Sequence, residues 1–347
     1  MRTGSSGAEW LRARTVWAAH PGALGTFNGM AAPATSVTEP ARAERATGAD
    51  DYGAQGPDEW LDIDWNRHQR WVELPDGPVN VIERGEGPPL LLVHGHSGRW
   101  ANWLPTIPAL SRTHRVVAPD LPGFGNSPKP RGPITIENYG RTLDALMERL
   151  DIASAPIVGN SMGGFAAAEL AIKAPQRVER LVLVSAAGLA TKYLGRSTEF
   201  FRRRSYIAFA RVVNVYAAIP DARAETLVRR PRLRRRVLDV VVRHPERLSG
   251  PMCFELMRGS GKPAALDATD AIMDYDFRDR VSEIDCPTLI VWGRNDRVVS
   301  VESAEEYHRA IERSRVVVFD DTGHVPMVER PARFNTVLEK FLAEGSE

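Results

Sequence analysis

The stretch Gly159-Asn160-Ser161-Met162-Gly163 decides how this 347-residue chain is expected to fold. It matches the pattern G-x-S-x-G, and it lies directly between the apolar run Pro156–Val158 and the alanine-rich helical stretch Phe165–Lys173. A strand, a sharp turn and a helix in this order hold a serine in a strained backbone conformation at the positive end of the helix. Small residues at 159 and 163 relieve crowding in such a turn. We therefore predict that Ser161 is a nucleophile; the alternative is a glycine-rich turn with a bystander serine.

Outward from this turn, short apolar runs alternate with helical patterns. Such alternation is typical of an α/β fold with a mostly parallel, twisted sheet and helices on both faces. A hairpin is expected first, because Gln69–Glu73 and Val79–Glu83 flank the turn sequence Pro75-Asp76-Gly77. Further strands are predicted at Leu90–Val93, Arg115–Ala118, Pro156–Val158, Arg180–Val184, Thr288–Trp292 and Arg315–Phe319. Helices are predicted at residues 136–150, Phe165–Lys173, Ser303–Ile311 and Pro331–Leu342.

Residues 188–275 interrupt this alternation. The stretch holds helical patterns without a convincing strand, and it is too long for an ordinary loop. We predict an inserted helical cap. It carries 17 basic and 9 acidic residues, with arginine runs at Arg202–Arg204 and Arg234–Arg236. These arginines have three interpretations: recognition of a substrate carboxylate, attraction to an anionic membrane surface, or ordinary solvated helix faces.

Composition excludes several classes of protein. The net charge of +1 gives no overall basis for nucleic-acid binding, and no apolar stretch is long enough for a stable membrane span. Residues 1–58 lack a secretory signal and hydrophobic periodicity, so we expect a disordered N-terminal extension; the alternative is an over-long start, with Met30 as the initiator. The two cysteines, Cys253 and Cys286, are expected to be free thiols in a reducing, cytoplasmic compartment. The oligomeric state is not predicted.

A nucleophilic serine needs a base, and the base needs an acid that orients it. Asp296 follows the predicted strand Thr288–Trp292, and His324 follows Arg315–Phe319. Catalytic groups in open α/β sheets gather at the carboxyl ends of the strands. With Ser161 they form a triad in the chain order serine, aspartate, histidine. Asp320 and Asp321 are rival acids, but they precede His324 too closely to reach the far nitrogen of its ring.

An oxyanion requires preorganised hydrogen-bond donors. We expect the amide of Met162, at the helix start, and the amide of His96, in the loop after Leu90–Val93. Gly95 permits the sharp turn of that loop, and His94 is expected to be structural. The alternative for His94 and His96 is a metal pair, which the absence of a nearby cysteine or carboxylate cluster in the sequence disfavours. No metal and no cofactor are predicted.

Together these pieces resemble the α/β-hydrolase fold superfamily from Trp60 to Leu342. The resemblance rests on the His94-Gly95 loop, the turn at Ser161 and the segments Pro119–Ser127, Gly293–Asp296 and Gly323–Pro326. It implies a hydrolase core of residues 59–187 and 276–347, with 188–275 as a cap over the active site.

The resemblance also implies a role for each candidate residue. Ser161 is the nucleophile, His324 the general base and acid, and Asp296 the orienting carboxylate. The amides of His96 and Met162 form the oxyanion hole, while His94, Gly95, Gly159 and Gly163 support these loops.

Only a few residues indicate which subfamily of α/β hydrolases the chain resembles. Serine at 161 argues against haloalkane dehalogenases and epoxide hydrolases, which place aspartate there. Residues 159–164 are similar to those of meta-cleavage product hydrolases, which break carbon–carbon bonds, but His96-Ser97 and Val325 depart from that pattern. We therefore predict a serine hydrolase of carboxylic esters acting on a small or lipid-like molecule. The alternatives are a carbon–carbon bond hydrolase and a hydrolase-like protein that binds a small ligand without catalysis.

Overall fold

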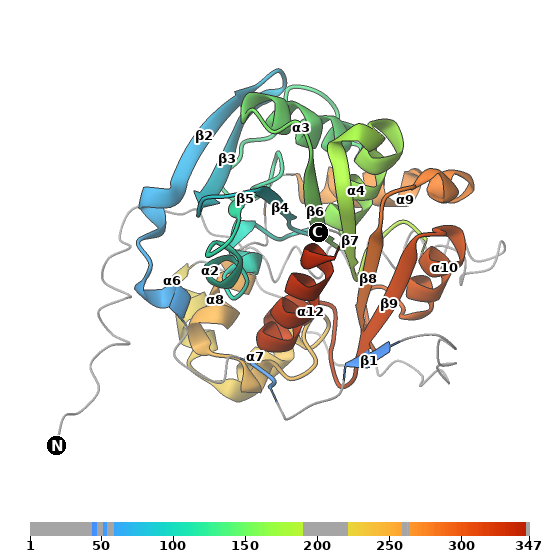
Figure 1. Ribbon diagram of the computed structural model, residues 1–347. Helices are drawn as coiled ribbons and strands as arrows, with labels where there is room; N and C mark the ends of the chain where they lie inside the picture. Colours follow the sequence, from blue (N-terminus) through green and yellow to red (C-terminus); the bar gives the residue numbers. More distant parts are fainter. Residues whose placement is uncertain are drawn as a thin grey trace. The chain divides into compact units, whose positions relative to one another are not determined.

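The computed structural model describes residues 44–46, 51–53, 59–189, 221–258, 262 and 264–344. Its described strands form one sheet in the order β1-β9-β8-β7-β6-β4-β5-β3-β2 (Figure 1). Pairing is parallel from β1 to β5, and β3 and β2 join as antiparallel strands at one edge. The sequence predicts a mostly parallel sheet and a hairpin around Pro75-Asp76-Gly77, and the structure confirms both features; β1, which precedes the hairpin, is not predicted.

The strands lie close to their predicted positions. Their bounds are β1 Glu44–Ala46, β2 Gln69–Leu74, β3 Gly77–Arg84, β4 Pro89–Val93, β5 Arg115–Pro119, β6 Ala155–Asn160, β7 Val178–Val184, β8 Thr288–Gly293 and β9 Ser314–Phe319. The helices are α2 Ile107–Leu110, α3 Ile136–Arg149, α4 Met162–Lys173, α6 Asp221–Val228, α7 Pro231–Leu238, α8 Gly250–Arg258, α9 Ala265–Asp274, α10 Glu302–Ala310, α11 Pro326–Glu329 and α12 Pro331–Ala343.

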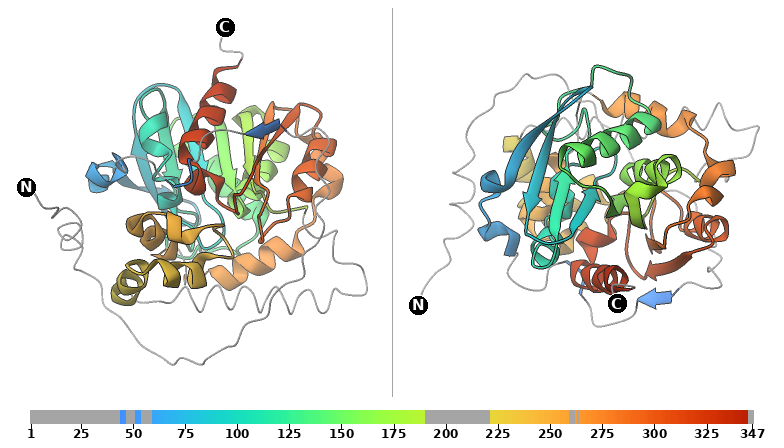
Figure 2. Two further views of the ribbon diagram at one scale, coloured as in Figure 1. Left: turned by 90° about the horizontal axis from the view of Figure 1, so that it is seen from below. Right: turned by 45° about the horizontal axis from the view of Figure 1, so that its top comes forward.

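Both faces of the sheet are covered by helices, as predicted (Figure 2). Alternate strand residues such as Leu91 and Ile157 join one apolar core with side chains of α3, α4 and α10. The intervening residues, such as Leu92, are buried on the opposite face, where Trp103 packs against Phe334 of α12 at 6.2 Å between ring centroids. The apolar strand runs are therefore explained by burial of the sheet on both sides.

Two short stretches within the expected N-terminal extension lie against the core. Residues 44–46 form β1, which pairs with β9, and Gly53 donates a backbone hydrogen bond to Glu329 at 2.7 Å. The expectation of disorder over 1–58 does not hold for these stretches, because they bind the core through contacts that sequence periodicity does not reveal. The other residues of 1–58 lie outside the described residues.

The described residues between β7 and β8 contain helices α6 to α9 and no strand, and the assignment of 188–275 as a cap stays a prediction. On α7, Arg232, Arg235 and Arg236 are exposed, whereas Arg234 donates to the carbonyl oxygen of Leu248 at 2.7 Å. This arrangement favours solvated faces for three arginines and a packing role for the fourth. The other run, Arg202–Arg204, lies outside the described residues. No helix in the described part of the chain combines the length and apolar character of a membrane span.

A buried ion pair joins the insertion to the core. Arg99, in the loop after β4, pairs with Glu255 of α8, and the two side chains are 7% and 2% exposed.

Replacing Glu255 with glutamine leaves a buried guanidinium without its counter-charge. We expect the Glu255→Gln variant to lose about 3 kcal/mol of unfolding free energy in urea denaturation. The matched change Glu59→Gln disrupts an exposed pair with Arg112, so it should cost less than about 1 kcal/mol. Equal losses in both variants would contradict this assignment.

Candidate active site

Ser161 occupies a strained turn between β6 and α4. Its backbone has φ 53° and ψ −117°, a combination that residues with a side chain rarely adopt. The carbonyl oxygen of Ser161 accepts the amides of Phe165 and Ala187, both at 3.1 Å, which ties the turn to α4 and to the loop after β7. The serine side chain is thus held at the amino end of α4, where the helix dipole favours negative charge.

The glycines on either side of Ser161 are required by close packing. A Cβ atom on Gly163 would lie 2.4 Å from the carbonyl oxygen of His94, and one on Gly159 would lie 2.4 Å from that of Gly163. These contacts involve backbone atoms that have no room to move. The G-x-S-x-G pattern therefore follows from the approach of α4 to β4 and β6.

His324 and Asp296 form a direct hydrogen bond. The His324 Nδ1 atom lies 2.8 Å from Oδ2 of Asp296, and the two side chains are 5% and 0% exposed. A carboxylate only accepts, so the neutral His324 ring carries its proton on Nδ1 and leaves Nε2 unprotonated. The other Asp296 oxygen, Oδ1, accepts the amides of Val298 at 2.8 Å and Val299 at 3.0 Å. These bonds fix the carboxylate in its orientation toward the ring.

Backbone and side-chain hydrogen bonds hold the loops of this site together. The amide of Asn295 donates to Thr322 at 2.8 Å, which joins the Asp296 loop to the His324 loop. The side chain of Asn160, next to Ser161, donates to the carbonyl oxygen of His324 at 3.3 Å. Ser161 Oγ itself makes no hydrogen bond to a described residue. Catalytic hydrogen bonds are often long without ligand and shorten in the substrate complex.

The rival acids have other partners. Asp320 pairs with Arg294, and Asp321 accepts from His244 Nε2 at 2.8 Å. Basic and histidine donors around Asp321 lower the pKa of its carboxyl group, although partial burial opposes this effect. Neither carboxylate is a hydrogen-bond partner of the His324 ring among the described residues, so Asp296 is the acid that the geometry associates with it.

The loop after β4 lies against the nucleophile turn. A Cβ on Gly95 would lie 2.9 Å from that of Ser161, and the amide of His96, in the same loop, has no acceptor among the described residues. Met162 begins α4, so its amide has no acceptor within the helix. Both predicted oxyanion donors therefore lie on segments that meet at Ser161.

The imidazoles of this loop are engaged with protein atoms. His94 Nε2 accepts the amide of Leu121 at 2.8 Å, and its Nδ1 donates to Gly95 at 2.7 Å. His96 Nε2 donates to the carbonyl oxygen of Ala265 in α9 at 2.7 Å. Burial lowers the pKa of both histidines, which favours their neutral form. His94 thereby connects two loops of the core, and His96 connects the core to the insertion.

Two supporting carboxylates were not singled out by sequence reasoning. Asp120 is fully buried after β5 and accepts the amides of Trp100 and Asn126, each at 2.8 Å. Glu329 is fully buried in α11 and accepts the amide of Gly323 at 2.9 Å. For Asp120, the signal available in the sequence is an acidic residue directly after an apolar strand run, whereas Glu329 has no comparable signal.

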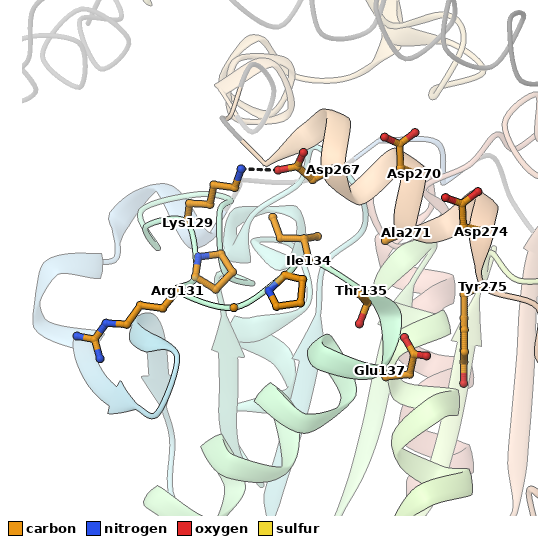
Figure 3. A pocket seen from close by; sticks show the side chains of 13 residues that line it. Lys129, Arg131, Ile134, Thr135, Glu137, Asp267, Asp270, Ala271, Asp274 and Tyr275 are labelled. Carbon is orange, nitrogen blue, oxygen red and sulfur yellow. Dashed lines mark ion pairs between the residues drawn. The ribbon is translucent and has the colours of Figure 1, made fainter.

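A groove of about 690 Å³ opens between the 129–137 loop and α9 (Figure 3). Acidic side chains from both walls face it, including Asp270, Asp274 and Glu137, and Lys129 pairs with Asp267 at 2.5 Å across its end. No member of the predicted triad lines this groove. It is therefore separate from the centre formed around Ser161.

Comparisons with known proteins agree with this fold. A family model described as alpha/beta hydrolase fold matches residues 88–331. The 2-hydroxy-6-oxo-2,4-heptadienoate hydrolase of Pseudomonas putida is 31% identical over 270 residues, which cover 76% of this chain and 92% of that protein.

Solved structures include enzymes of two activities. A meta-cleavage product hydrolase from Pseudomonas fluorescens superposes with a TM-score of 0.62 at 27% identity, covering 80% of this chain and 98% of that one. An esterase from Thermogutta terrifontis gives a TM-score of 0.60 at 26% identity, covering 79% and 97%. The chain is thus similar both to carbon–carbon bond hydrolases and to an esterase.

The crowding at Gly163 predicts a loss of stability. We expect Gly163→Ala to lower the unfolding free energy by about 1–3 kcal/mol or more, because the added methyl group meets backbone oxygens. Gly132→Ala is a suitable control, since its Cβ would meet only the flexible Asp76 side chain at 3.3 Å; it should change stability by no more than about 1 kcal/mol. Urea titration of both variants measures the difference. A Gly163→Ala variant as stable as the control would contradict the packing argument.

Proposed function

The chain belongs to the α/β-hydrolase family, and on this premise we propose that it is a cofactor-free serine hydrolase of carboxylic esters. The observation that carries this proposal is the pairing of His324 with Asp296 at 2.8 Å, on a loop that the side chain of Asn160 ties to the turn where Ser161 has φ 53°. The substrate is a small molecule of moderate to lipid-like size. Cys253 and Cys286 are both free thiols, which supports a reducing, cytoplasmic location.

The proposed mechanism follows the charges of the site. His324 Nε2 removes the proton from Ser161 as Oγ attacks the ester carbonyl carbon. Asp296 stabilises the resulting imidazolium, and the amides of Met162 and His96 stabilise the negative oxygen of the tetrahedral intermediate. His324 then protonates the departing alcohol, and water activated by the same nitrogen releases the acid and regenerates Ser161.

The distribution of buried charge supports an ester without an acidic group. A dienoate, such as the name of the relative from Pseudomonas putida denotes, presents a carboxylate that requires a cation in the pocket. Among the described residues, the buried basic side chains are Arg99 and Arg330, and both pair with carboxylates, Glu255 and Asp51. Neither is left to neutralise an acidic substrate.

The second candidate is carbon–carbon bond hydrolysis on the same residues. Its support is the 31% identity to the heptadienoate hydrolase and the likeness to the meta-cleavage product hydrolase. A hydrolase-like protein that binds a ligand without turnover is the third alternative, and it predicts that no substrate of a broad panel is turned over.

The role of Asp296 predicts a specific kinetic loss. We expect Asp296→Asn to lower kcat by about 10³- to 10⁴-fold, because an amide at this position favours the wrong tautomer of His324. Asp320→Asn, which disrupts only the pair with Arg294, should stay within about threefold of the wild type. Steady-state kinetics on a p-nitrophenyl ester compare the two variants. Similar losses at both positions would argue against the assignment of the acid.

A substrate panel tests the reaction itself. We expect the wild type to release p-nitrophenol from esters between acetyl and palmitoyl, and Ser161→Ala to be at least about a thousandfold slower. A dienol-keto acid, followed by its loss of absorbance, should react slowly or not at all. Rapid turnover of the dienol-keto acid with inert esters would establish the second candidate instead. If a fluorophosphonate labels Ser161 but no substrate is turned over, the third alternative is favoured.

A further inference from the structure

The carboxylate of Glu329 holds the backbone on both sides of His324. Its Oε1 atom accepts the amide of Gly323 at 2.9 Å and that of Val325 at 3.3 Å. The amide of His324 itself donates to Val241 of the insertion at 2.9 Å. Three successive amides are thereby fixed, so the direction in which the His324 side chain leaves the backbone is set by these contacts.

The second oxygen of Glu329 is occupied by two other parts of the chain. Oε2 accepts the hydroxyl of Tyr52 at 2.6 Å and the amide of Arg243 at 2.8 Å. The Tyr52 oxygen in turn accepts the amide of His244 at 2.6 Å. One buried carboxylate therefore links the His324 loop, the insertion and a segment that precedes the hydrolase core by sequence.

That segment, residues 51–53, is firmly docked beside the start of α12 (Figure 1). Asp51 pairs with Arg330 at 2.8 Å and with Arg333 at 3.0 Å. Tyr52 is only 4% exposed, and its ring packs edge-to-face on His244 with centroids 5.1 Å apart. These ion pairs and the burial of Tyr52 show that residues 51–53 are bound to the core through the side chains of Asp51 and Tyr52.

We propose that Tyr52 and Glu329 are positioning residues for His324, and that residues 51–53 act as a clamp on the loop that carries it. The inference rests on the proposed function, in which His324 is the general base. A shift of a base by a fraction of an ångström weakens proton transfer while substrate binding is kept. The clamp is thus expected to act on kcat and to leave KM nearly unchanged.

The ionised form of the Glu329 carboxylate depends on the hydrogen-bond donors around it. Burial raises the pKa of Glu329, and the hydrogen bonds from Tyr52 and the amides of Arg243, Gly323 and Val325 oppose that rise. Phenylalanine at 52 preserves the ring but removes one of these donors. The remaining amides then hold a carboxylate that is less well stabilised in its ionised form.

The test compares Tyr52→Phe with Tyr275→Phe in the full-length chain. Tyr275 also donates to a buried carboxylate, Glu169, at 2.7 Å, but it does not contact the His324 loop through any described bond. We expect Tyr52→Phe to lower kcat by about 10-fold and Glu329→Gln by about 100-fold, with KM within about twofold of the wild type. Tyr275→Phe should leave kcat within about twofold. Equal kcat values for the two tyrosine variants would count against the clamp.

A second measurement does not depend on turnover. The ¹H–¹⁵N resonances of the His324 ring, assigned by their absence in a His324→Gln variant, report its bond to Asp296. They should shift or broaden in Tyr52→Phe and Glu329→Gln and stay unchanged in Tyr275→Phe. Unchanged ring resonances in all three variants would overturn the proposal. If the wild type hydrolyses no ester, the proposed function fails, and these spectra still decide whether the clamp positions His324.

Discussion

Parallel pairing from β4 through β6, β7 and β8 to β9 is the constraint on which the rest of the molecule depends. Parallel strands place all their carboxyl ends at one edge, so the loops after these strands have to meet there. That edge carries Ser161, Asp296 and His324, which lie far apart in sequence. Helices α4 and α12 pack on opposite faces of the sheet.

Local sequence predicts the parts of this arrangement that depend on periodicity or on a short turn. Apolar runs locate the strands because burial on both faces demands such runs, and the glycines at 159 and 163 reveal the turn because backbone atoms approach within 2.4 Å of an added Cβ. The aspartate and the histidine are found by their place after strands. Each of these signals lies within about ten residues of the feature it predicts.

Contacts between distant polar residues leave no such signal. Tyr52 and Glu329 are 277 positions apart, and Arg99 and Glu255 are 156 positions apart. Each member of these pairs looks like an ordinary polar residue in its own neighbourhood, because only the folded chain removes it from water and supplies its partner. For the same reason, the sequence could assign residues 51–53 to an extension but could not show that they bind the core.

Ser161 and His324 are held in different ways, and this difference has a consequence for the insertion. Ser161 is fixed by crowding within its own turn, whereas the His324 loop depends on donors and acceptors from Val241 and Arg243. These residues belong to the same insertion whose helix α9 accepts a hydrogen bond from the His96 side chain. The insertion therefore contributes to the orientation of His324 as well as to the position of the loop that carries His96. Under the proposed function, changes in its sequence alter both together, so we expect substrate preference and catalytic rate to be coupled.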